Sequence, residues 1–192
     1  TICSRTFFEE EVAMSAQRNS DSVPAASSSS WQSARLLVTD EFAAPPVILR
    51  VGDSVIGTLG NFSASTGKAK SKKTFNVCAI VAAAMTGGTV LNYSASLPPR
   101  KRRILYVDTE QSRFHCKRVL CRILRLAGLP TDAHPPLLEF LCLRGYATKE
   151  RLRKIEEAIY DLDNLGLVVI DGIRDLAHDI NSPGEATDLI TK

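Results

Sequence analysis

Residues 67–74 read Gly67-Lys68-Ala69-Lys70-Ser71-Lys72-Lys73-Thr74. Before them, residues 55–63 form an apolar run that ends in small side chains, which predicts a buried strand. After them, residues 74–85 are apolar and rich in alanine, and Gly87-Gly88 follows, which predicts a buried helix with a glycine stop. The N-terminus of such a helix offers free N–H groups and the positive end of its dipole, so this strand–loop–helix favours phosphate binding.

The spacing within residues 67–74 is close to the phosphate-loop pattern GxxxxGK[ST]. Gly67 takes the first position, Lys73 that of the lysine and Thr74 that of the hydroxyl, whereas Lys72 replaces the second glycine. We expect all eight residues to contact a nucleotide, with Lys73 at the β- and γ-phosphates of ATP and Thr74 as a ligand of Mg²⁺. The alternative is a solvated loop of lysines and serines.

A carboxylate follows the next predicted strand, residues 104–108, in the sequence Asp108-Thr109-Glu110-Gln111. A carboxylate just beyond a core strand is placed to polarise the water that attacks the γ-phosphate. Glu110 is therefore our candidate catalytic residue. The alternative for this acid is an ordinary helix cap.

A later apolar run, residues 167–171, ends in Asp171 and continues with Gly172. An apolar strand that ends in aspartate has the form in which the carboxylate reaches Mg²⁺, directly or through water. The alternative is a strand that ends in an Asp-Gly turn. All three features follow predicted parallel strands, and ligands bind beyond the carboxyl ends of such strands, so together they predict one site.

The rest of the chain alternates short strands with helices. Apolar runs predict strands at 47–51 and 139–143, helical periodicity predicts helices at 114–127 and 149–162, and residues 92–103 are predicted to form a loop. Ser182-Pro183-Gly184-Glu185 has the form of a helix start. This alternation predicts an α/β fold, with a mostly parallel sheet flanked by helices on both faces.

Composition adds limits on partners and domains. The 192 residues carry a formal charge of +3, which permits a nucleic-acid partner without requiring one. No apolar run approaches the roughly 20 residues of a membrane span, so we expect no membrane partner.

The five cysteines include no CxxC pair, which favours a reducing, cytoplasmic location. Residues 1–30, with the Ser/Ala-rich stretch 15–30, are predicted to be a flexible tail before an ATP-binding domain at 31–192.

Three stretches together resemble RecA-like P-loop ATPases: Gly67…Lys73-Thr74, Tyr106-Val107-Asp108-Thr109-Glu110 and Val168-Val169-Ile170-Asp171-Gly172. Among these ATPases, the chain resembles most the RepA-type, replicative-helicase-like branch. Two further stretches, Gly57-Thr58-Leu59-Gly60-Asn61-Phe62 and Asp171-Gly172-Ile173-Arg174-Asp175-Leu176, are similar to AAA-family ATPases on mobile elements of Bacteroides-type bacteria.

The resemblance implies phosphate and Mg²⁺ roles for Lys73 and Thr74, a catalytic carboxylate at Glu110 and a Walker B aspartate at Asp171. It also implies a homo-oligomeric ring and a core with more strands, so that this domain would be incomplete at its C-terminus. Lys72 departs from the family's glycine.

The expected function is Mg-ATP binding and hydrolysis by a RecA-like ATPase that acts on DNA, in replication or in mobilisation of a mobile element. The alternative is an ATP-binding regulatory or scaffolding module without a DNA partner. A small-molecule kinase is a third interpretation, which the position of Glu110 disfavours.

The basic run at residues 100–103 could contact DNA phosphates or a neighbouring subunit, or be a solvated loop. Arg174 and Asp175 could lie near the γ-phosphate or form a local salt bridge.

Overall fold

The computed structural model describes residues 2–3, 31–67 and 72–177. Residues 31–44 belong to one compact unit, and the remaining described residues belong to the other. In the smaller unit, the short 3-10 helix Gln32–Ala34 precedes a turn in which the Leu37 N–H donates to the Asp40 carboxylate at 2.8 Å. The predicted tail lies outside the described residues, except for Ile2–Cys3, which form a strand. The predicted helix start at 182–185 also lies outside them.

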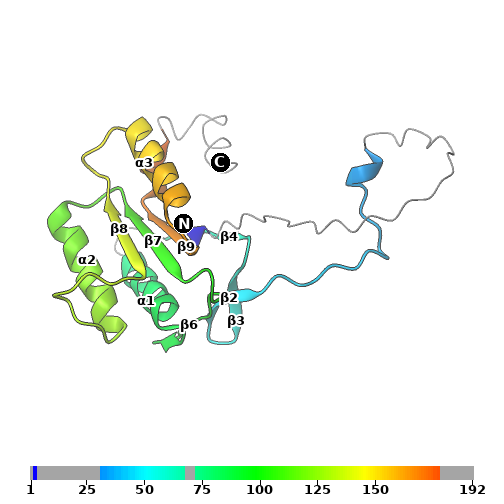
Figure 1. Ribbon diagram of the computed structural model, residues 1–192, viewed down its shortest axis with the longest axis horizontal. Helices are drawn as coiled ribbons and strands as arrows, with labels where there is room; N and C mark the ends of the chain where they lie inside the picture. Colours follow the sequence, from blue (N-terminus) through cyan, green and yellow to red (C-terminus); the bar gives the residue numbers. More distant parts are fainter. Residues whose placement is uncertain (1, 4–30, 68–71, 178–192) are drawn as a thin grey trace, which may run out of the picture. The chain divides into compact units, whose positions relative to one another are not determined.

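The larger unit alternates strands and helices, as Figure 1 shows. Its strands are β1 Ile2–Cys3, β2 Val47–Val51, β3 Ser54–Thr58, β4 Phe62–Ser63, β5 Thr89–Val90, β6 Tyr93–Ala95, β7 Arg103–Asp108, β8 Leu138–Cys142 and β9 Leu165–Asp171. Its helices are α1 Lys73–Thr86, α2 Arg113–Leu126, α3 Thr148–Asp161 and the short 3-10 helix η2 Ile173–Leu176. No helix among the described residues is long and apolar enough to cross a membrane.

The main sheet has the strand order β4-β1-β9-β7-β8. Strand β7 pairs in parallel with both β8 and β9, which confirms the predicted α/β arrangement with a parallel sheet. Strand β1 is antiparallel to both β9 and β4, so β4 runs in the same direction as β9. The ends of β4, β9, β7 and β8 therefore face the same edge of the sheet.

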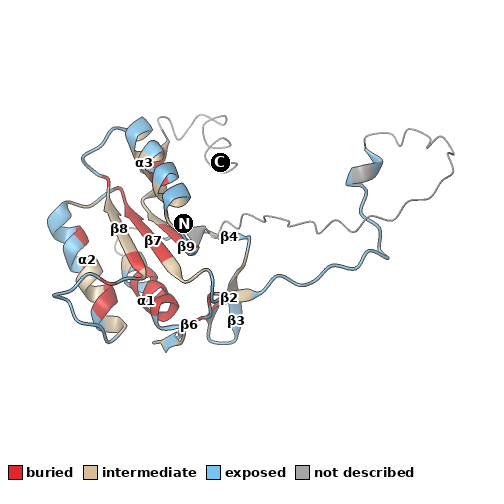
Figure 2. Cartoon of the chain, viewed as in Figure 1, coloured by how far each residue is buried: buried red, intermediate tan, exposed pale blue. Residues whose placement is uncertain are grey.

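Both faces of this sheet are covered, and the side chains of β7 alternate between them. Ile104 and Tyr106 join the core that includes residues of α1 and α2. Leu105 and Val107 join a second core with residues of α3. Figure 2 shows much of β7 and most of α1 as buried, whereas α2 and α3 are exposed on their outer sides. The near-continuous apolar sequence of β7 follows from this double cover.

The predicted helices form with nearly the predicted bounds. Helix α1 is buried at nine successive residues, 77–85, and its small alanines allow close packing against the strands and α2. Gly87 ends it with φ 68°, a left-handed conformation that favours glycine. Helices α2 and α3 are amphipathic, as their sequence periodicity predicts.

Two predictions about the strands are wrong. Residues 55–63 form two strands instead of one, because Gly60, with φ 81°, turns the chain between β3 and β4. Strand β3 pairs with β2 in a second sheet, of order β3-β2-β6-β5, and only the short β4 leads toward residue 67. The predicted loop at 92–103 contributes β6 to this second sheet, where Leu49 and Ala95 are paired. Strands this short carry too little periodicity to be found in the sequence.

Candidate functional site

Two aspartates meet where the central strands of the main sheet end. Asp108 of β7 and Asp171 of β9 are register partners, and Cys142 of β8 is the partner of Asp108 on its other side. Helix α1 brings Thr74 to the same edge, because its hydroxyl donates to Asp171 Oδ2 at 3.0 Å. The structure thus joins residues from three predicted loops that lie up to 97 positions apart in sequence.

Asp171 receives a second hydroxyl on the same oxygen. The phenol of Tyr106 donates to Asp171 Oδ2 at 3.1 Å, from a side chain that is fully buried in the sheet. Burial, together with the negative charge of Asp171, raises the pKa of Tyr106 far above its usual range. The phenol is therefore a permanent donor that fixes the orientation of this carboxylate.

Residues 72–74 open α1 with a left-handed turn. Lys72 is the N-cap residue, with φ 61° and ψ 23°, the left-handed conformation for which the pattern normally has glycine. Its carbonyl accepts the N–H groups of Phe75 at 3.0 Å and Asn76 at 3.2 Å. The backbone keeps the glycine conformation with a lysine in place, at a cost of about 1–2 kcal/mol for an L-residue.

The side chain of Lys73 folds back toward Gly67. Its Nζ donates to the carbonyl of Gly67 at 2.7 Å, across the segment that precedes α1. Lysines that bind phosphate act as point charges, and the charge of this one is held beside the Gly67 carbonyl. Of the eight predicted nucleotide contacts, Lys68, Ala69, Lys70 and Ser71 lie outside the described residues.

Asp108 organises the turn that presents Glu110. It is fully buried, and its Oδ1 accepts the N–H groups of Glu110 at 3.0 Å and Gln111 at 2.7 Å. Its Oδ2 accepts the side-chain amide of Gln111 at 2.7 Å. Burial raises the pKa of Asp108 while these hydrogen bonds lower it. Both of its carboxylate oxygens thus accept hydrogen bonds from its own loop.

Glu110 is exposed at the tip of this turn. Partial burial, followed by the negative charges of Asp171, Asp175 and Asp108, raises the pKa of Glu110, whereas Lys73 lowers it. A carboxylate with a raised pKa is suited to general-base work, because a stronger base takes a proton from water more readily.

Two cysteine thiols donate hydrogen bonds to the end of this turn. The carbonyl of Gln111 accepts from Cys116 Sγ of α2 and from Cys142 Sγ of β8, each at 3.6 Å. Burial raises the pKa of Cys116, so its thiol stays protonated and remains a donor. The turn at 108–111 is therefore tied to both neighbouring elements.

Gly172 allows the loops after β7 and β9 to touch. It has φ 98°, and a Cβ there would lie 2.2 Å from Thr109 Oγ1 and 2.7 Å from Glu110 Cγ. The buried Thr109 hydroxyl donates to the Gly172 carbonyl at 2.7 Å, and its N–H donates to the Asp171 carbonyl at 3.1 Å. A side chain at position 172 would collide with the loop after β7, so the contact between the two loops requires glycine here. The positive φ of Gly172 favours glycine as well.

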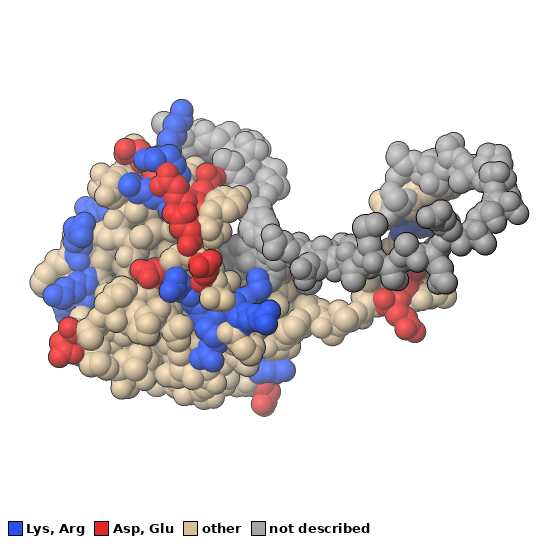
Figure 3. Space-filling view, viewed as in Figure 1, with Lys and Arg blue, Asp and Glu red and all other residues tan. Residues whose placement is uncertain are grey.

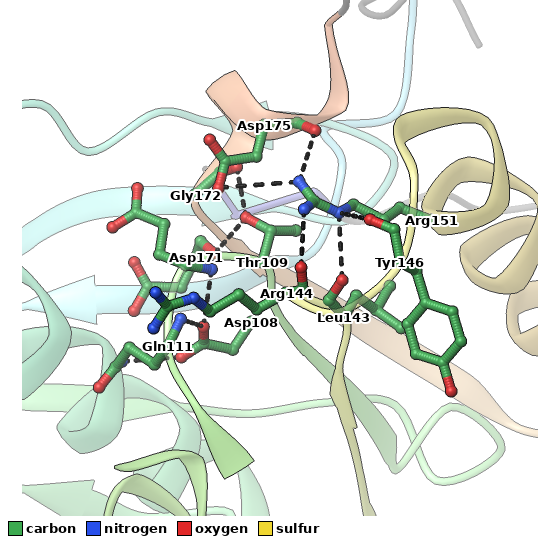
Figure 4. A network of polar contacts seen from close by, with 11 residues as sticks. Asp108, Thr109, Gln111, Leu143, Arg144, Tyr146, Arg151, Asp171, Gly172 and Asp175 are labelled. Carbon is green, nitrogen blue, oxygen red and sulfur yellow. Dashed lines mark hydrogen bonds and ion pairs between the residues drawn. The ribbon is translucent and has the colours of Figure 1, made fainter.

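Arg151 of α3 ties together the loops after β8 and β9, as the network in Figure 4 shows. Its guanidinium donates to four carbonyl oxygens: Leu143 at 3.1 Å, Tyr146 at 2.8 Å, Arg144 at 3.0 Å and Asp175 at 2.9 Å. It also pairs with the Asp175 carboxylate at 3.9 Å. The salt bridge considered for Arg174 and Asp175 thus involves Arg151. Sequence reasoning missed this arginine because it looks like any charged residue of an amphipathic helix.

The basic run at 100–103 lies far from this edge. It precedes and begins β7, whereas Asp108 ends the strand. Arg102 packs beside Gly87, where a Cβ would be 3.4 Å from its guanidinium, at the C-terminus of α1. A cation there complements the negative end of the helix dipole. The position of Arg102 thus gives it a structural contact, and the phosphate contact considered for residues 100–103 stays a prediction.

The residues present fit a bound Mg²⁺. Thr74 and Asp171 place a hydroxyl and a carboxylate in direct contact, and both are oxygen ligands of the kind Mg²⁺ prefers. Within the described ranges, no three His, Cys, Asp or Glu side chains form an all-protein metal cluster. Mg²⁺ does not need one, because it binds through one or two protein groups together with water and substrate phosphates.

Comparison with known protein families gives a match over most of the chain. A family model described as an AAA domain matches residues 32–191 of the chain. No curated protein and no solved structure matches it. The matched residues include the ends of β7, β8 and β9.

Proposed function

Because this chain belongs to the AAA domain family of P-loop ATPases, we propose that it binds Mg-ATP at the edge where β7 and β9 end, and that it hydrolyses this ATP as a RecA-like ATPase. The observation that carries the proposal is the hydrogen bond from Thr74 Oγ1 to Asp171 Oδ2 at 3.0 Å. It joins the hydroxyl of the phosphate loop to the aspartate of the distant strand β9. Such a pair is what a shared Mg²⁺ requires.

The proposed roles follow from position and charge. Lys73 binds the β- and γ-phosphates, with the loop residues Gly67 to Lys72 around them. Thr74 and Asp171 hold Mg²⁺, which neutralises charge on the phosphate oxygens when it is bound. Glu110 accepts a proton from the attacking water, and the turn built on Asp108 presents it.

We further propose that hydrolysis drives work on DNA in the cytoplasm, within a homo-oligomeric ring, during replication or mobilisation of a mobile element. The support for this step is the similarity of three strand-end stretches to replicative-helicase-like ATPases. The alternative, an ATP-binding regulatory module without a DNA partner, uses the same nucleotide site. The two differ in whether DNA changes ATP turnover.

The test has two parts. Calorimetry should show ATP binding by the wild-type chain and loss of most affinity in Lys73→Ala, with the same far-UV spectrum. Equal binding by both proteins would remove the phosphate-loop assignment. ATP turnover measured with and without single-stranded DNA then separates the two functions, since stimulation supports the DNA-acting ATPase and an unchanged rate supports the regulatory module.

A further inference from the structure

Helix α2 carries an unusual charge pattern. None of its 14 residues is acidic, and five are basic: Arg113, Lys117, Arg118, Arg122 and Arg125. The ion pairs within the described part of the chain involve His134, Arg151 and Arg153, and none includes a residue of α2. Figure 3 shows basic side chains gathered over this side of the molecule. The face is therefore complementary to an anionic partner.

Most of the basic residues of α2 form a stripe along an open hollow on the surface of the helix. An open hollow of about 580 Å³ is lined by Phe114, Lys117, Arg118, Cys121, Arg122, Arg125 and Leu126. These positions recur at spacings of three and four, so they lie on one side of the helix. The opposite side, with Val119 and Ile123, is buried in the core. From Phe114 to Arg125 the stripe is roughly 16 Å long, the length of a few nucleotides.

One aromatic side chain stands in this stripe. Phe114 is 68% exposed, and its ring meets that of His115 edge-on at 5.4 Å between centroids. An exposed ring among cations is the combination with which proteins bind single strands, because bases stack on the ring and phosphates contact the cations. A membrane surface would need an apolar helix face directed outward, and the apolar face of α2 is already buried.

We propose that the outer face of α2 binds single-stranded nucleic acid, with Lys117, Arg118 and Arg125 at the phosphates and Phe114 stacked on a base. The inference rests on the proposed function, for which it names the nucleic-acid-binding surface. Helix α2 begins two residues after Gln111, so the bound strand would lie beside the loop that presents Glu110.

The experiment measures binding of a fluorescein-labelled oligothymidine to the full chain by anisotropy, at low salt and without nucleotide. The triple variant Lys117→Ala/Arg118→Ala/Arg125→Ala should bind at least tenfold more weakly. Its slope of log K against log salt should be smaller by about 2, since each phosphate contact on a single strand contributes roughly 0.7. Phe114→Ala should lose about 5- to 100-fold in affinity, whereas Phe114→Trp should retain it.

A matched control removes three exposed or part-exposed cations from α3, on the other face of the sheet, as Lys149→Ala/Arg153→Ala/Lys154→Ala. It has the same change of net charge and should keep most of the affinity. Equal weakening by both triple variants would overturn the proposal, since it would show only nonspecific attraction. Absence of binding by the wild type, or binding only to anionic vesicles, would overturn it as well.

ATP binding separates this inference from the proposed function. The α2 triple variant should bind ATP as the wild type does, because none of its changes lies in residues 67–74 or at Asp171. Lys73→Ala should lose ATP and keep the oligonucleotide. If ATP binds normally but no oligonucleotide binds, the α2 surface is wrong and the nucleotide site stands.

Discussion

Asp108 and Asp171 end neighbouring parallel strands and are register partners, yet their carboxylates have different surroundings. Asp108 is fully buried, and its hydrogen bonds come from residues two and three positions later in its own loop. Asp171 is partly exposed, and its hydrogen bonds come from Thr74 on α1 and Tyr106 on β7. The same residue type at equivalent positions thus builds a turn in one loop and joins distant elements in the other.

The largest expected effect is on ATP turnover, which should depend far more on Asp171 than on Asp108. Asp171→Ala removes the carboxylate that contacts Thr74, so ATP turnover should fall by about 10²- to 10⁴-fold, the range for loss of a group that acts in the chemical step. Asp108→Asn should lower turnover by less than tenfold, since its amide oxygen still accepts from the turn. Steady-state phosphate release measures both. Similar losses in the two variants would remove the distinction.

For the free energy of unfolding we expect the reverse order, with a larger loss in Asp108→Ala than in Asp171→Ala. Asp108→Ala leaves the N–H groups of Glu110 and Gln111 without their acceptor, at about 1–3 kcal/mol for each buried unsatisfied group, so the free energy of unfolding should fall by about 3 kcal/mol. Asp108→Asn should cost about 1 kcal/mol, because the Gln111 amide can rotate to accept from it. Urea unfolding provides the values. A loss in Asp171→Ala as large as that in Asp108→Ala would contradict this assignment.

Contact between the two loops can be tested at Gly172. Gly172→Ala places a methyl group against Thr109 and Glu110 at φ 98°, so we expect a loss of about 2 kcal/mol and lower turnover. Two controls are available in the chain. Gly128→Ala has positive φ with open space around it and isolates the backbone strain, and Gly145→Ala meets nothing within 4 Å and should be nearly neutral. If Gly172→Ala matches Gly128→Ala in stability and leaves turnover intact, the loops need no close contact.

The charges around Glu110 should appear in the pH dependence. A general base must be deprotonated, so kcat/KM should fall about tenfold per pH unit below the pKa of Glu110. Because burial and the nearby carboxylates raise this pKa, the acid limb should lie above that of an ordinary glutamate. Asp175→Asn removes one of these charges and should move the limb to lower pH. A limb at the same pH in both proteins would exclude Glu110 as the titrating group.

The smallest expected effect concerns the backbone of the phosphate loop. Lys72→Gly relieves the left-handed strain at φ 61° but adds freedom to the unfolded chain, so stability should rise by about 1 kcal/mol at most. Lys72→Ala keeps the strain and serves as the control for the side chain. Thermal melts of the three proteins provide the comparison. Destabilisation by glycine would mean that the lysine side chain contributes contacts that offset its backbone strain.

Much of the site could be located from the sequence. The strand ends at Asp108 and Asp171 and the helix start at Thr74 follow from local apolar runs and glycine stops, and the structure brings all three to one edge. Arg151 and Tyr106 could not be found in this way. Each looks like an ordinary member of its own element, and its partners lie on other elements, so only the folded chain shows that Arg151 contacts four carbonyl groups.

The sequence by itself determined the long helices, the strands β7, β8 and β9 and the chemical groups at their ends, because helical and strand periodicity is set by neighbours a few residues apart. The tertiary structure decided that β7 lies between β8 and β9, that residues 55–63 divide between two sheets, and that Gly172 must be glycine. Strand pairing and loop contact join residues tens of positions apart, and their free energy depends on packing that no local pattern contains. Asp108 and Asp171 therefore differ in role because of their neighbours in space.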